Sequence, residues 1–167
     1  MQMSEETRDE LNRLIGRCFE MNSFCDNVAY ELGYYNFPHI EKIFHLTFAH
    51  AFTGDKFADG LSDFMLELEA RPVRLPVPEH SKSYNGNLIA MFDDVLLECE
   101  KFRQDIIRAI EIAELNEDME VKIYLEDLIE DFVPYRKQAK DWATQAHRYA
   151  QDEVSFDIHF DAFSYLE

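Results

Sequence analysis

Residues 71–86, RPVRLPVPEHSKSYNG, decide the fold of this chain. They contain Pro72, Pro76 and Pro78, and proline cannot continue a helix. This segment is therefore predicted to be an extended connection. Its sixteen residues are enough to travel the length of a helical bundle.

Long helices are predicted on both sides of this connection, because apolar residues recur three and four positions apart. The predicted helices cover residues 4–33, 38–70, 87–115 and 119–150. Ser4 is a suitable cap for the first helix, and Pro38 suits the first turn of the second. Two antiparallel helix pairs joined by one long crossover predict an all-α, ferritin-like four-helix bundle. The crossover lies between the second and third helices.

The chain has 167 residues, of which 47% are hydrophobic, and this suits one domain with a sizeable core. We expect the bundle to occupy residues 1–150. Residues 151–167 form an acidic, aromatic tail whose conformation and docking place the sequence leaves open. Cys18, Cys25 and Cys99 lie among apolar neighbours and are predicted to be reduced core residues.

The net charge of −18 indicates the kind of partner that the chain attracts. Such a charge repels nucleic acid and attracts cations, so we expect no DNA binding at physiological salt. A solvated acidic surface is the simpler interpretation of the same charge. No apolar run approaches the roughly 20 residues of a membrane span, and no signal peptide is visible, so a cytoplasmic protein is expected.

A row of possible metal ligands lies along the predicted helix over 38–70. On a regular helix Glu41, His45, Asp55 and Asp59 fall within roughly 80° of arc. The pair Glu41 and His45 lies about 21 Å from the pair Asp55 and Asp59, too far for one ion within one subunit. An antiparallel second copy would bring the two pairs together, so the pattern predicts a metal site shared across a two-fold axis.

Several motifs resemble those of the Dps branch of the ferritin-like superfamily. The matching residues are Leu11-Asn12, Phe19, Asn27, Phe37, Phe44, Phe48 and the run Tyr124–Glu130. The family's His-Trp pair is Ala29-Tyr30 here, and its His-x-x-x-Asp is Glu41-x-x-x-His45. The resemblance implies a twelve-subunit shell, self-associated through the second helix, that oxidises ferrous iron with peroxide and stores the product. It also implies iron as the metal at Glu41, His45, Asp55 and Asp59.

Three alternatives remain open. The first is a ferritin-like shell or scaffold with a degenerate, non-catalytic metal site. The second is a di-iron centre inside one subunit, although no Glu-x-x-His motif occurs in the chain. The third is a helical adaptor dimer that holds partners through its aromatic tail.

The other histidines and the single tryptophan are expected to have structural roles. His39 and His50 are predicted to point away from the Glu41 face of the second helix. His80, His147 and His159 are expected to be surface or packing residues, and Trp142 a packing residue.

Overall fold

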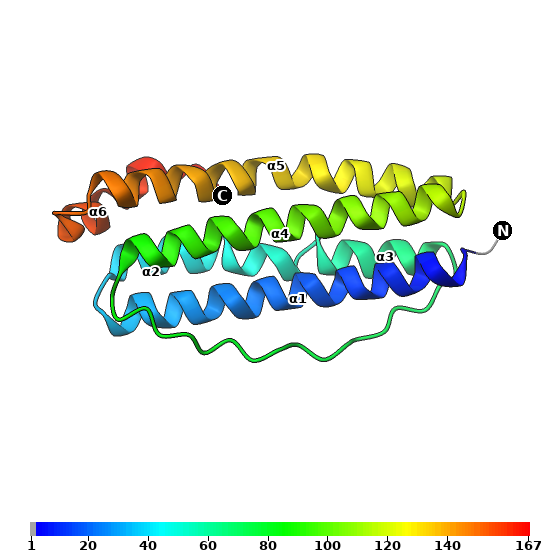
Figure 1. The fold of residues 1–167 in the computed structure, drawn as a ribbon, viewed down its shortest axis with the longest axis horizontal. Helices are drawn as coiled ribbons and strands as arrows, with labels where there is room; N and C mark the ends of the chain where they lie inside the picture. Colours follow the sequence, from blue (N-terminus) through cyan, green and yellow to red (C-terminus); the bar gives the residue numbers. More distant parts are fainter. Residues whose placement is uncertain (1–2) are drawn as a thin grey trace.

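Two antiparallel pairs of helical columns form the molecule in a computed structural model that describes residues 3–167 (Figure 1). The first pair of columns consists of α1 (Glu5–Tyr34) and a broken column of α2 (Pro38–Thr47), η1 (Ala49–Thr53) and α3 (Ala58–Glu67). The second pair is α4 (Leu88–Leu115) and α5 (Met119–Arg148), followed by α6 (Glu153–His159) and η2 (Phe160–Phe163). Residues 68–87 run along the outside of the bundle from α3 to α4. The predicted all-α bundle with a long crossover is confirmed.

Ser4 caps α1, as the sequence predicts. Its hydroxyl oxygen accepts a hydrogen bond from the backbone N–H of Thr7 at 3.2 Å. The hydroxyl also lies 2.9 Å from Oδ2 of Asp118, in the turn between α4 and α5. The start of α1 is therefore tied to the second helix pair at the same end of the bundle.

The second column differs from the continuous helix predicted over 38–70, and that prediction was wrong. The α-helix ends at Thr47 and gives way to the 3₁₀ helix η1, and Gly54 has an extended backbone with φ −91° and ψ −166°. Phe48, Phe52 and Phe57 are nevertheless all fully buried. In a regular helix Phe57 would point about 140° away from Phe52 and could not enter the same core. The break allows all three rings to pack inside the bundle.

Aromatic rings fill the centre of the bundle. Phe52 contacts five rings at centroid distances of 5.2 to 6.2 Å, and these belong to Phe48, Phe57, Phe102, Phe132 and Tyr135. Trp142 is fully buried against Phe44, Phe48 and Phe92. Its predicted packing role is confirmed. Ring pairs of this kind add about 0.5–1.5 kcal/mol to the free energy gained by burial alone.

Gly60 allows the chain to fold tightly at the start of α3. A Cβ at this position would lie 2.1 Å from the carbonyl oxygen of Asp55 and 2.9 Å from the hydroxyl of Tyr124. Both distances are below any normal contact. At Gly54, which lies just before this point, an added Cβ would be 3.4 Å from the carbonyl oxygen of Ala51.

We expect the Gly60→Ala variant to be less stable by about 1–3 kcal/mol, because the turn must open to admit the methyl group. Gly54→Ala is the matched control, with an expected change within about 0.5 kcal/mol. Urea unfolding followed by circular dichroism measures both free energies. Equal unfolding midpoints for the two variants would show that the tight turn at Gly60 does not affect stability.

The C-terminal tail is helical and packs on its own bundle. Phe156 and Phe160 are fully buried, and the ring of Phe160 stacks on Trp142 at 4.9 Å. Asp157 accepts the backbone N–H groups of His39 and Ile40 at 3.1 and 3.0 Å, so it caps α2 from α6. The division into a bundle over 1–150 and a tail over 151–167 stays a prediction.

Candidate metal centre

The sequence-predicted ligands lie on both sides of the break in the second column. Glu41 and His45 are one turn apart on α2, and Oε1 of Glu41 is 3.9 Å from Nδ1 of His45. Asp55 lies in the turn after η1, and Asp59 is in the first turn of α3; both are exposed. Because the helix is broken, the four residues do not form one continuous helical face. Whether a second subunit joins the two pairs stays a prediction.

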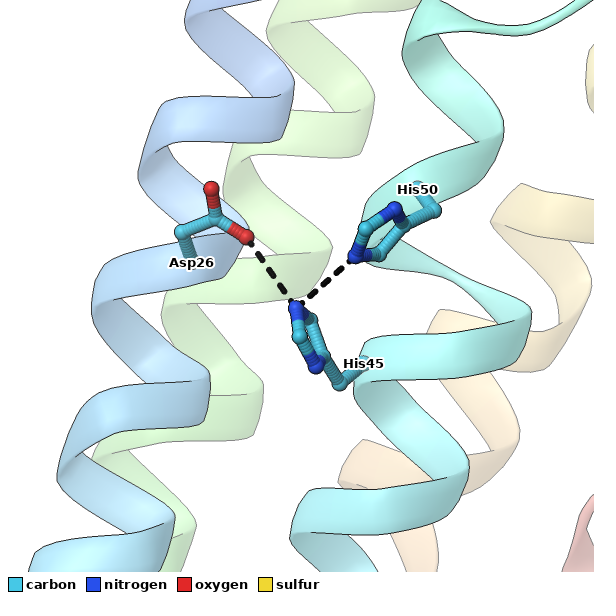
Figure 2. A group of neighbouring side chains, drawn as sticks. All are labelled: Asp26, His45 and His50. Atoms are coloured by element: carbon cyan, nitrogen blue, oxygen red, sulfur yellow. Dashed lines mark hydrogen bonds and ion pairs between the residues drawn. The ribbon is translucent and has the colours of Figure 1, made fainter.

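A different group of ligand-type side chains converges beside α2. Nε2 of His45 is 2.8 Å from Nε2 of His50 and 3.6 Å from Oδ1 of Asp26 (Figure 2). The three atoms all lie within 4.8 Å of one another. Around a metal ion with bonds of about 2.0–2.2 Å, neighbouring ligand atoms are about 3–3.5 Å apart. The two distances from Nε2 of His45, 2.8 and 3.6 Å, lie on either side of this range, and the shorter is also that of a hydrogen bond between the two imidazoles.

Three elements supply this group. Asp26 projects from α1, His45 belongs to the last turn of α2, and His50 lies in η1 (Figure 2). The prediction that His50 points away from this face was wrong. On a regular helix His50 would lie about 140° from His45. The change to a 3₁₀ turn after Phe48 brings its ring to the α1 side.

The carboxylate of Asp26 has an unsatisfied oxygen. Its Oδ1 atom is buried and has no hydrogen-bond partner among the described residues. A buried acceptor without a partner lowers the stability of the fold by about 1–3 kcal/mol, and such atoms are rare in native proteins. Oδ1 faces Nε2 of His45, and a cation between the two would satisfy it.

Glu41 lies near Nδ1, the other ring nitrogen of His45. When Nε2 of an imidazole binds a metal, Nδ1 carries the proton and usually donates to a carboxylate. The carboxylate of Glu41 stands on that side, at 3.9 Å from Nδ1. Its predicted role as a metal ligand stays a prediction.

The bundle interior contains no comparable group within residues 3–167. The buried centre consists of aromatic and aliphatic side chains. The carboxylates of Glu20 and Glu98 form ion pairs with the guanidinium group of Arg17, at 2.7 and 3.9 Å. Burial raises the pKa of the thiols of Cys18, Cys25 and Cys99, so these free cysteines stay protonated and are poor ligands. The structure does not support a di-iron centre inside the subunit.

The remaining histidines lie outside this group. Nδ1 of His39 is 2.8 Å from Oδ2 of Asp157, and Nε2 of His147 is 3.0 Å from Oδ1 of Asp93. His80 is part of the crossover, and its Nε2 atom lies 3.7 Å from Oε1 of Glu20 but forms no hydrogen bond within the described residues. Nδ1 of His159 is 2.9 Å from the carbonyl oxygen of Ser155. These contacts agree with the structural roles that the sequence predicts.

Comparison with solved structures relates this arrangement to a known fold. The chain superposes on an open-pore ferritin from the hyperthermophilic archaeon Archaeoglobus fulgidus with a TM-score of 0.89, at 16% identity, over 99% of this chain and 98% of that one. The fold is ferritin-like. An engineered closed form of the A. fulgidus ferritin matches with a TM-score of 0.90, and a humanized archaeal ferritin with 0.89. Both are 16% identical, over 99% of each chain.

At this identity the likeness establishes the ferritin-like fold and no more. These matched structures are ferritins, so the comparison does not single out the Dps branch. No family model and no curated protein matches the sequence. Within residues 3–167 no helix has the length and apolar character needed to cross a membrane.

Proposed function

We propose that this protein binds ferrous iron at Asp26, His45 and His50 and acts as a ferritin-like iron-oxidising and iron-storing protein. The observation that carries the proposal is the convergence of two imidazole nitrogens and one unsatisfied carboxylate oxygen within 4.8 Å. Two histidines and one carboxylate are a ligand set typical of non-haem iron, and they leave positions open for water or an oxidant. Glu41 positions His45 from the other side of its ring.

The charge of the chain favours the same function. With a net charge of −18, the surface raises the local concentration of cations and guides them to the site. The group lies at the surface, since the side chains of Asp26 and His45 are 29% and 35% exposed and His50 is exposed, although Oδ1 of Asp26 is itself covered. An ion would reach the site from the His50 side, as iron uptake requires.

Self-association extends this proposal. In a homo-oligomer with α2 and α3 packed antiparallel across a two-fold axis, Asp55 and Asp59 of a second subunit would approach Glu41 and His45. They would then supply further oxygen ligands, and the metal site would be shared between subunits. A closed shell of twelve subunits is the assembly that we propose on this basis.

A non-catalytic ferritin-like scaffold is the second candidate. The aromatic interior of the bundle favours it, because rings of Phe48, Phe52 and Phe102 fill the space where inward-facing carboxylates would hold two irons. In that case the shell or bundle would persist without oxidising iron.

Aerobic oxidation of Fe²⁺, followed by ferric absorbance with and without peroxide, distinguishes the two candidates. We expect the wild type to oxidise iron faster than buffer alone, and His45→Ala to lose that advantage. His147→Ala is the matched control and should behave as wild type, because His147 lies outside the group. Asp59→Ala should lower the rate only if a second subunit completes the site. Buffer-like rates for wild type and His45→Ala alike would favour the scaffold.

A further inference from the structure

A groove between α4 and α5 differs in charge from the rest of this acidic chain. It has a volume of about 390 Å³, and Leu96, Ile129 and Val133 contribute apolar surface to it. Four of the sixteen basic side chains of the protein line it, against two acidic ones. The local charge is therefore positive, although the chain carries a net charge of −18.

Part of this basic surface has no partner within the described residues. Arg136 pairs with Glu100 at 2.5 Å, and Lys137 pairs with Asp141 at 2.6 Å. Arg103 and Lys140, in contrast, form no ion pair in residues 3–167. Val133 beside them is 62% exposed, so apolar surface and unpaired positive charge meet at the same place.

The outer face of α6 has the complementary chemistry. Val154 and Ile158 lie one helical turn apart and are 68% and 57% exposed, while Phe156 and Phe160 on the inner face are fully buried. Glu153 and Asp161 are exposed near the two ends of this apolar pair. The outer face is thus a short apolar ridge with carboxylates at both ends.

The groove and the ridge belong to different parts of one molecule. α6 packs against α2, η2 and the end of α5, at one end of the bundle (Figure 1). The groove involves residues 96–103 of α4 and 129–140 of α5, in the middle of those helices. A ridge that packs at the bundle end cannot occupy the groove of its own subunit.

We infer that the α6 ridge of one copy docks into the α4–α5 groove of a second copy of this chain. Val154 and Ile158 would cover the apolar floor, and Glu153 and Asp161 would pair with Arg103 and Lys140. The contact joins two different surfaces, so each subunit offers one groove and one ridge, and the contact repeats around a ring or shell. It does not depend on a metal ion.

Sedimentation velocity of the full chain without metal tests this inference. We expect the wild type to be an oligomer. Two variants should give smaller species: Ile158→Asp, and the double variant Arg103→Glu/Lys140→Glu. Adding Glu153→Lys/Asp161→Lys to the second variant should restore the wild-type mass, because the charges are exchanged across the contact. Ile123→Asp, at an exposed residue outside both surfaces, is the control and should assemble normally.

Mixing the two defective variants provides a second measurement. The Ile158→Asp variant keeps its groove and the charge-reversed variant keeps its ridge, so a mixture should regain one contact and form larger species than either alone. A monomeric wild type would overturn the inference. Normal assembly of Ile158→Asp would also overturn it. So would a failure of the exchanged charges to restore assembly, provided that circular dichroism shows folded protein. Either result would point to a different partner for the groove.

Discussion

Replacing His45 by alanine should weaken the binding of Co²⁺, used as a spectroscopic substitute for Fe²⁺, by about 100-fold or more. His45 lies at the centre of the group, with one ring nitrogen 2.8 Å from His50 and 3.6 Å from Asp26. Loss of an outer partner of a metal ligand already costs about 10–100-fold in affinity, so loss of the central ligand should cost at least as much. Titration followed by the visible absorbance of Co²⁺ measures the affinity and the ligand geometry together.

Two further variants and one control test this assignment. Asp26→Asn keeps the shape of the side chain and removes its charge, so it should weaken binding while leaving the fold intact. Glu41→Gln should weaken binding by about 10–100-fold without changing the number of ions bound, since Glu41 acts through His45. His147→Ala should bind as wild type. If His45→Ala and His147→Ala bind Co²⁺ equally, the ion is held elsewhere on the acidic surface.

Replacing Phe52 by alanine should lower the free energy of unfolding by about 3–5 kcal/mol. Phe52 is fully buried and contacts five aromatic rings, from η1 across to α4 and α5. Its removal leaves a cavity where the broken column meets the second helix pair. For a chain of this size the melting temperature should fall by roughly 6–20 °C, at about 2–4 °C per kcal/mol.

Leu66→Ala is the matched control for this change. Leu66 lies on α3 and is 61% exposed, so its truncation should change the stability by no more than about 0.5 kcal/mol. Urea unfolding of both variants at equal subunit concentration gives the comparison, because assembly adds to the apparent stability. If Phe52→Ala loses no more than about 0.5 kcal/mol, as a surface substitution does, the rings do not hold the break in place.

The sequence was sufficient to predict the architecture, for a clear physical reason. The prolines of 71–86 exclude a helix there, and the apolar spacing on both sides fixes the ends of the four helical columns within a few residues, although not the break inside the second. Ser4 was recognisable as a cap because its residue type and position suffice. The tail was less predictable, since its helical form depends on the contacts that Phe156 and Phe160 make with Trp142 and its neighbours.

The candidate site was only partly predictable. Glu41 and His45 are neighbours because i, i+4 spacing on α2 is a local property. His50 and Asp26 were missed, because the orientation of His50 depends on the break after Phe48 and the place of Asp26 depends on how α1 packs on α2. The spacing of Phe48, Phe52 and Phe57 was the available signal, since no regular helix buries all three.

The aromatic interior also determines where metal chemistry can occur in this ferritin-like bundle. Rings occupy the centre, and the candidate ligands lie between α1 and the broken column, where the side chains of Asp26 and His45 are partly exposed. The break therefore has two effects: it admits Phe57 to the core, and it brings His50 to Asp26 and His45. Core packing and the candidate metal centre depend on the same irregular turn.

Anomalous X-ray diffraction from crystals soaked in Fe²⁺ without oxygen, measured at the iron absorption edge, tests the central claim most directly. We predict one strong peak per subunit between Oδ1 of Asp26 and the Nε2 atoms of His45 and His50, at about 2.0–2.2 Å from each. That peak should be absent in His45→Ala crystals. No peak at this position, or peaks only at other acidic residues, would contradict the proposed metal centre.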